Sequence, residues 1–177
     1  MITLRPMAAS ELARIGEVDR SEHVTQEYVY RRGALEARSV DVRVPRWSGS
    51  GDHEDSVRGR TLAWRPLLER GGTLIGAFDA EALVGFAIYR PHLAEGTANL
   101  AVLHVSRSHR RTGVGARLAG EVARLARADG ARRLYVSATP SAPTVHFYRS
   151  LGFAPTDEPN DELFALEPDD IHMILEL

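Results

Sequence analysis

Residues 100–118 read LAVLHVSRSHRRTGVGARL, and this stretch decides the fold of the chain. Its first residues form an apolar, β-branched run with the length of a buried strand, which we place at 97–105. After a basic turn, Gly113 opens a helix whose apolar residues recur at steps of three and four, at Val114, Leu118, Val122 and Leu125. The start of such a helix has free backbone N–H groups at the positive end of the helix dipole. Because glycine lets an anion approach the backbone closely, the stretch predicts an anion-binding turn.

Two segments of this region resemble a known family. Residues 110–115, RRTGVG, resemble the Arg/Gln-x-x-Gly-x-Gly/Ala signature of the GNAT N-acetyltransferase superfamily. Residues 141–153, SAPTVHFYRSLGF, are similar to the family's Asn-x-x-Ala-x-x-Phe-Tyr-x-x-x-Gly-Phe segment. The resemblance is carried by residues from about 74 to 153. It implies an α+β fold, with a mixed, mostly antiparallel sheet of six to seven strands, about four flanking helices and a splayed pair of central strands.

The resemblance also implies a reaction and its acyl donor. The expected activity is transfer of an acetyl group from acetyl-CoA to a primary amine of a small molecule or peptide, with no metal. Backbone amides and arginine side chains would hold the pyrophosphate, and the backbone of the splayed strand would pair with pantetheine. The predicted cofactor-binding residues are Leu103, His104, Val105, Arg110, Arg111, Thr112, Gly113, Val114, Gly115, Ala116 and Ser141.

Tyr148 is the predicted catalytic residue. It matches the family tyrosine that lies near the thioester sulfur, where a phenol can protonate the departing thiolate. The backbone N–H of Val105 is expected to polarise the carbonyl, while Phe147 is expected to pack in the core. The chain has no cysteine and no Ser-His-Asp pattern, so we expect direct attack by the amine in a ternary complex.

The sequence departs from the family where a base for the amine is expected. Asn99 and Ala101 stand at positions where members carry a Glu or a pair of His, and neither can take a proton. Simple strand alternation places His104 on the opposite face. The base is therefore left open: it acts directly or through water, with Glu22, His23, His92, Glu95 and His172 as candidates, or it is absent. Ser141 replaces the family Asn, and serine can still cap the helix and offer a hydroxyl.

The acceptor is expected near residues 17–27, where the chain carries four acidic side chains. These acids either attract a cationic amine or form a solvated helix face. Glu22, His23 and Asn99 are the predicted acceptor-binding residues. Two other functions stay open: a non-catalytic acyl-CoA sensor, and a basic helix that docks on nucleic acid. Because dimers are common in the family, the resemblance is also compatible with a homodimer.

Composition narrows the class of protein. The chain has 177 residues, a net charge of −2 and no cysteine, which indicates one globular domain without disulfides and argues against a nucleic-acid partner. It has no apolar leader or membrane-length run, so we expect a cytoplasmic protein that does not bind membranes. His53, Glu54 and Asp55 are consecutive and do not converge as metal ligands would.

Local patterns predict the remaining elements. We expect strands at 2–5, 39–44, 73–78, 83–90, 133–139 and 171–177. We expect helices at 10–18, capped by Ser10, around Val24 and Tyr28, before Gly71, and from Ser141 to Gly152. Residues 47–56 are predicted to form a flexible loop, and 157–170 an acidic loop.

Overall fold

A seven-stranded mixed sheet forms the centre of the computed structural model, which describes residues 1–177. Its strands lie in the order β1 (Ile2–Met7), β4 (Thr73–Asp79), β5 (Ala82–Ala94), β6 (Thr97–Val105), β7 (Arg133–Ala138), β9 (Ile171–Glu176) and β8 (Ala154–Pro155). All neighbours are antiparallel except β6 and β7, which are parallel. The α+β fold predicted from the sequence is confirmed.

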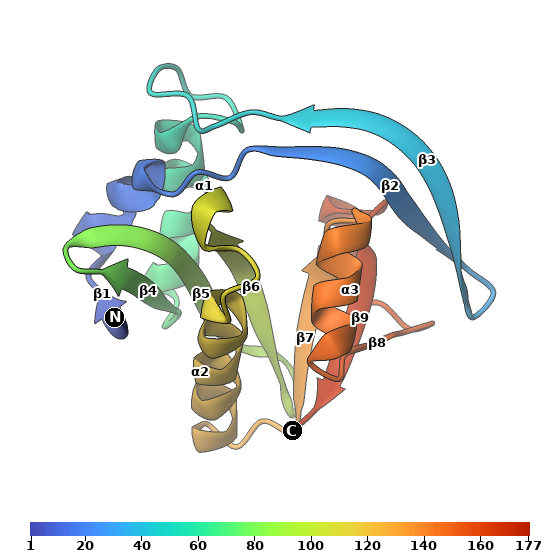
Figure 1. The fold of residues 1–177 in the computed structure, drawn as a ribbon. Helices are drawn as coiled ribbons and strands as arrows, with labels where there is room; N and C mark the ends of the chain where they lie inside the picture. The colour runs from blue at the N-terminus through green and yellow to red at the C-terminus, as the bar shows by residue number, and fades with distance from the viewer.

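The parallel pair at the centre of the sheet is splayed. β6 and β7 pair only through Thr97–Asn99 and Arg133–Tyr135. Beyond this point the two strands spread apart, as Figure 1 shows. At the last paired position the Asn99 amide donates to the Tyr135 carbonyl at 3.0 Å. The upper part of β6 therefore has its β5 edge paired and its other edge open to the gap.

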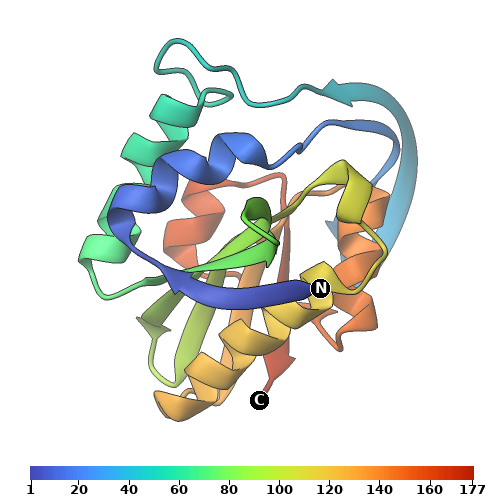
Figure 2. The same cartoon turned by 60° about the vertical axis from the view of Figure 1, so that its left-hand side comes forward.

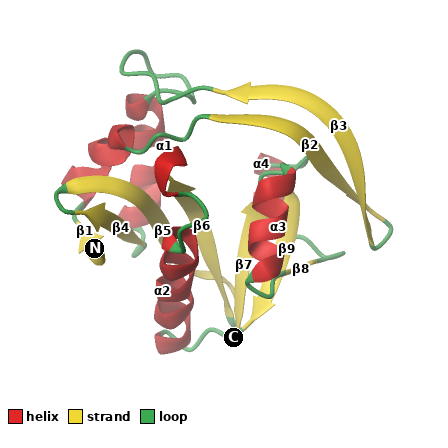
Figure 3. Ribbon diagram, in the orientation of Figure 1, coloured by secondary structure: helices red, strands yellow, loops and turns green.

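Helices cover both faces of the sheet (Figures 2 and 3). On one face, α2 (Val114–Ala128) and α3 (Ala142–Ser150) pack beside the gap, and Leu118 and Val122 of α2 are fully buried. On the other face, a 3₁₀ helix, η1 (Ala9–Glu17), packs with α1 (Val57–Glu69). The apolar stripe predicted for the glycine-turn helix is confirmed.

A β-hairpin arches over the gap, and it corrects the second helix expected near Val24 and Tyr28. β2 (Glu22–Arg31) and β3 (Ala34–Val44) form a separate two-stranded sheet, visible as the long curved arm in Figure 1. Residues four apart share a face in a strand as well as in a helix, so the spacing was ambiguous. Tyr28 ties the arm to α3, since its hydroxyl lies 2.9 Å from Nε2 of His146.

A β-bulge in β6 corrects the predicted facing of His104. Val102 pairs with Ile88 and Leu100 pairs with Tyr89, so Ala101 is an extra residue. Such a bulge shifts the alternation of side chains. Leu103 then packs toward α2, whereas Ala101 packs with Val102 toward α1. His104 points to this second side, where it meets the ring of Phe86, so it shares a face with Ala101.

Two smaller expectations change, whereas residues 47–56 form a loop as expected. Ser10 lies inside η1; the cap position is Ala8, whose N–H donates to the Glu11 carboxylate at 2.9 Å. A short helix, α4 (Asp161–Leu166), interrupts the expected acidic loop and is capped by the Asn160 side chain. The stretch 47–56 is closed by backbone bonds, and both Trp47 and Ser56 in it are buried.

No helix is both long and apolar enough to span a membrane. No group of three or more His, Cys, Asp or Glu side chains is arranged to hold a metal ion.

Candidate active site

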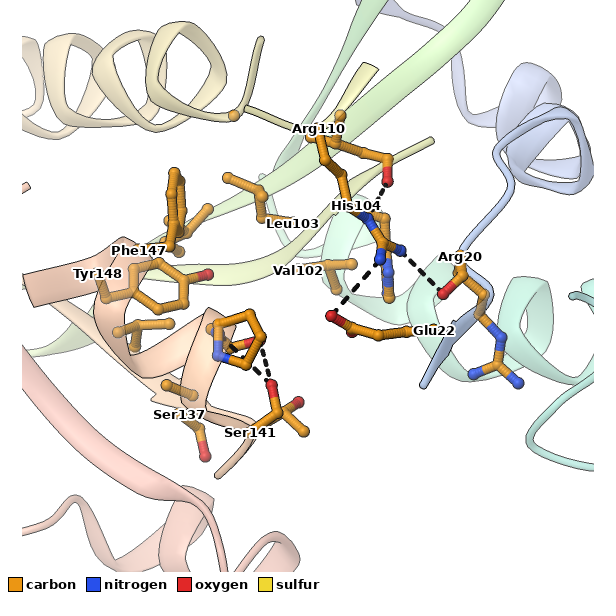
Figure 4. Close-up of a pocket in the computed structure, with 18 of the residues that line it drawn as sticks. Arg20, Glu22, Val102, Leu103, His104, Arg110, Ser137, Ser141, Phe147 and Tyr148 are labelled. Carbon is orange, nitrogen blue, oxygen red and sulfur yellow. Dashed lines mark hydrogen bonds and ion pairs between the residues drawn. The ribbon is translucent and has the colours of Figure 1, made fainter. Parts of the chain in front are cut away.

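The gap between β6 and β7 opens into a cavity of about 840 Å³. It is lined by both central strands, the start of α2, α3, the hairpin arm and α1. Figure 4 shows Tyr148 at one end of this pocket and Arg20 at the other, with Glu22 and Arg110 between them. The splay therefore produces a long pocket with chemically different ends.

The glycine turn forms one wall of the pocket. Arg111 and Gly113 have left-handed backbone conformations, with φ of 61° and 88°, and they turn the chain into the 15-residue α2. A Cβ on Gly115 would lie 3.2 Å from the Phe147 ring, so α2 and α3 pack closely at this glycine. These residues and Ala116 line the pocket. The open helix start can accept a pyrophosphate.

The side chains of Arg110, Thr112 and Val114 are engaged in contacts within the chain. The Arg110 guanidinium donates to the carbonyls of Val105 and Arg20 at 3.2 and 2.9 Å, and it lies 3.6 Å from the Glu22 carboxylate. Thr112 donates to the His109 carbonyl at 2.6 Å, and Val114 is buried in the core. Arg110 thus joins β6 to the start of the arm and remains part of the pocket wall.

The backbone of β6 offers alternate amides to the gap. The Ser106 N–H donates to the Val84 carbonyl across the β5 edge at 2.8 Å. In an antiparallel pair, bonded and non-bonded positions alternate, so His104 also turns its backbone toward β5. Leu103 and Val105 turn theirs toward the open side. Of the three predicted backbone contacts, these two have the required orientation.

Tyr148 and Ser141 both line the pocket beside α3. The Tyr148 hydroxyl points into the cavity in Figure 4, while its ring packs edge-on against Phe147 and Phe153. Burial, with the nearby Asp170 carboxyl adding to it, raises the pKa of Tyr148, so the phenol keeps its proton. Ser141 caps α3 and is itself buried, with its hydroxyl 2.9 Å from that of Thr144.

Asp170 is a pocket residue that the sequence did not single out. It precedes β9, where the pairing of Ile171 with Ala138 brings it beside Ser137, whose hydroxyl donates to Asp170 at 3.3 Å. Burial and the neighbouring Glu167 carboxylate raise the pKa of Asp170 to about 7. In sequence it is one of many acids between 157 and 170, and no local pattern distinguishes it.

The predicted bases and acceptor residues are mostly placed elsewhere. Glu22 alone among them lines the pocket. His23 pairs with Asp41 at 2.6 Å on the arm, and the Asn99 amide is bonded to β7. His172 lies 2.6 Å from the Tyr135 hydroxyl within the core, while His92 and Glu95 stand at the far end of β5.

His104 is also unsuited to act as a base. Its ring lies 5.2, 6.1 and 5.4 Å from those of Trp47, Trp64 and Phe86. Burial, together with the positive charges of three arginines, lowers the pKa of His104 to about 3. The imidazole is therefore neutral near pH 7 and would bind a proton poorly.

Solved structures with this fold include several acetyltransferases. Nourseothricin acetyltransferase aligns with a TM-score of 0.73 at 20% identity, covering 99% of this chain and 98% of that one. PaiA N-acetyltransferase from Thermoplasma acidophilum, in complex with coenzyme A, aligns at 0.64 and 15%, covering 100% and 99%. Ribosomal-protein-S18-alanine N-acetyltransferase from Escherichia coli aligns at 0.63 and 16%, covering 99% and 94%. No curated protein matches the chain by sequence.

The family assignment comes from the sequence itself. The model of the acetyltransferase (GNAT) family matches residues 40–153, which is more than half of the chain and includes the glycine turn, the splayed strands and Tyr148. Members of this family are N-acetyltransferases that use acetyl-CoA. The chain belongs to the acetyltransferase (GNAT) family.

Proposed function

We propose that this enzyme transfers the acetyl group of acetyl-CoA directly to a primary amine of a small molecule or peptide, with Asp170 as the base and Tyr148 as the acid. The observation that carries the proposal is the convergence, in one pocket, of the open β6 backbone, the Tyr148 hydroxyl and the Asp170 carboxyl. Bound acetyl-CoA supplies an acetyl group activated as a thioester.

Different groups of the chain bind different parts of the acyl donor. Backbone amides at the start of α2 hold the pyrophosphate, and Arg111, which lines the pocket there, adds charge. The amides of Leu103 and Val105 pair with the donor's pantetheine and polarise the carbonyl oxygen, a role we give first to Val105. The Ser141 hydroxyl can form a hydrogen bond with the same pantetheine group.

Asp170 receives the proton of the attacking amine. The nitrogen bonds to the carbonyl carbon, the carbon–sulfur bond breaks, and Tyr148 donates its proton to the departing sulfur. A carboxyl with a pKa of about 7 is a stronger base than an ordinary Asp and is half-ionised near neutral pH. The exposed Glu167 next to it adds negative charge that favours a cationic acceptor.

The test is thiol release from acetyl-CoA over a panel of primary amines, joined to calorimetry with desulfo-CoA. We expect Tyr148→Phe to lower kcat by about a hundredfold while binding desulfo-CoA like the wild type. Tyr30→Phe, which removes a phenol hydroxyl outside the pocket lining, is the matched control. Unchanged turnover in Tyr148→Phe removes the tyrosine from the mechanism, and binding without any thiol release indicates an acyl-CoA sensor.

A further inference from the structure

The end of the pocket opposite Tyr148 carries donors without acceptors. Arg20 and Trp47 line it, and their Nε and Nε1 atoms are buried with no hydrogen-bond partner. Arg60 of α1 joins them, and its Nε is likewise buried and unpartnered. Buried N–H groups are costly to leave unpaired, so three of them in one wall call for an acceptor that is not part of the chain.

These donors are held rigidly. The Arg20 side chain is 10% exposed, with its guanidinium carbon 4.1 Å from the centre of the Trp47 ring. Trp47 packs edge-on against Trp64 at 6.0 Å, and the Arg60 guanidinium lies 5.6 Å above Trp64. Segments from before β2, after β3 and within α1 therefore fix one another through edge-on aromatic and cation–π contacts. A ligand bound here would meet donors already in position.

The charges at this end do not cancel. Arg20 is paired with Asp55, and Arg110 with Glu22. In the neighbouring loop, Asp52 also forms an ion pair, with Arg58 at 3.1 Å. Arg60 forms no ion pair with any carboxylate. The wall thus carries one positive charge in excess, and His104, which is neutral near pH 7, adds no charge to it.

We propose that the acceptor amine carries an oxyanion, and that Arg60, Arg20 and Trp47 bind it at the end of the pocket away from Asp170. This inference rests on the proposed function and names its substrate class: a zwitterionic amine such as an amino acid or an acidic peptide. The amine faces Tyr148 and Asp170, and the anionic group faces the arginines. A carboxylate and a phosphonate share the required chemistry, because both accept several N–H bonds.

The test compares each anionic acceptor with a neutral counterpart. Glycine, β-alanine and γ-aminobutyrate are each set against their primary amides, and aminoethylphosphonate against ethylamine, with kcat/KM measured by thiol release. We expect at least one anionic amine to exceed its neutral counterpart by about 10- to 100-fold, mainly through KM. The series reports the distance between the amine and the anion, and the phosphonate distinguishes the two kinds of oxyanion.

Arg60→Gln is the decisive variant, and we expect it to bring this ratio down toward one. The ratio cancels effects common to both acceptors, including partial loss of folded protein. Arg65→Gln, an exposed arginine on the same helix and outside the pocket, is the matched control and should keep the wild-type ratio. A wild-type ratio near one, or a ratio that Arg60→Gln leaves unchanged, overturns the proposal while leaving the acetyltransferase assignment intact.

A binding measurement decides the question if no amine of the panel is acetylated. Glutarate and inorganic phosphate are then added to the free protein, and Tm is followed. The proposal requires that one of these anions raise the Tm of the wild type and of Arg65→Gln by more than that of Arg60→Gln, since phosphate can also bind the start of α2 in all three proteins. Equal shifts in all three proteins, or none in any, refute the anion subsite, whereas absent thiol release bears on the proposed function alone.

Discussion

Replacing Asp170 by Asn separates its role in the reaction from its cost to the fold. The amide has nearly the same shape and can still accept the Ser137 hydroxyl, which lies 3.3 Å away. It cannot take a proton from the amine. We therefore expect Asp170→Asn to lower kcat/KM by about 10²- to 10⁴-fold, the usual worth of a general base, and to be more stable than the wild type at about pH 8.

The sign of the stability change follows from the pKa. Folding raises the pKa of Asp170 from 3.8 to about 7, so the folded state binds this proton more tightly than the unfolded state does. Ionisation therefore costs stability, with no effect below about pH 4, a growing cost between about pH 4 and 7, and the full cost above. A shift of about three pKa units would correspond to a cost of about 4 kcal/mol in the free energy of unfolding, and the partial exposure of Asp170 reduces this cost to about 2 kcal/mol.

The assays are thermal unfolding and the pH dependence of kcat/KM. About 2 kcal/mol corresponds to a Tm gain of about 4–8 °C for a chain of this size at about pH 8, with no gain at about pH 4. Wild-type kcat/KM should rise through about pH 7, and that step should vanish in Asp170→Asn. The groups that face Asp170 are Ser137, Tyr148, Glu167 and Asp169, and the exposed Asp169→Asn is the matched control. Full activity in Asp170→Asn, or lower stability at about pH 8, refutes the reasoning.

Three further substitutions test the pocket and the core. Arg110→Ala should lower the free energy of unfolding by about 1–3 kcal/mol, because it leaves two carbonyls and the Glu22 carboxylate without their partner. Arg111→Ala should weaken desulfo-CoA binding without this loss of stability. Calorimetry and denaturant unfolding distinguish the two effects, and the opposite pattern would indicate that Arg110 binds the phosphates. Gly115→Val should impair cofactor binding, since even a Cβ there lies 3.2 Å from Phe147; binding as tight as wild type would show that α3 can yield. Leu118→Ala should cost about 3–5 kcal/mol in urea unfolding, as its side chain is fully buried; a loss under about 1 kcal/mol would contradict the packing described here.

The sequence by itself determined the centre of this protein. A strand, a glycine turn and an amphipathic helix are encoded in neighbouring residues, so the turn at Gly113 and the Val114–Ala128 helix could be predicted from local pattern. Ser141 at the cap of α3 and the position of Tyr148 within that helix could also be predicted. These features depend on contacts between residues close in the chain, together with a family resemblance carried by the same residues.

Tertiary structure alone decided which side chains meet in the pocket. The first strand of the hairpin was mistaken for a helix because Val24 and Tyr28 fit either period, and only pairing with β3 selects the strand. Asp170 reaches Ser137 through pairing of β9 with β7, over 33 residues of chain. Arg20, Trp47 and Arg60 come from three separate segments, and their unpaired donors become visible only when burial removes water from them. Local sequence specifies elements, whereas charge, burial and pKa are properties of the space that distant elements enclose.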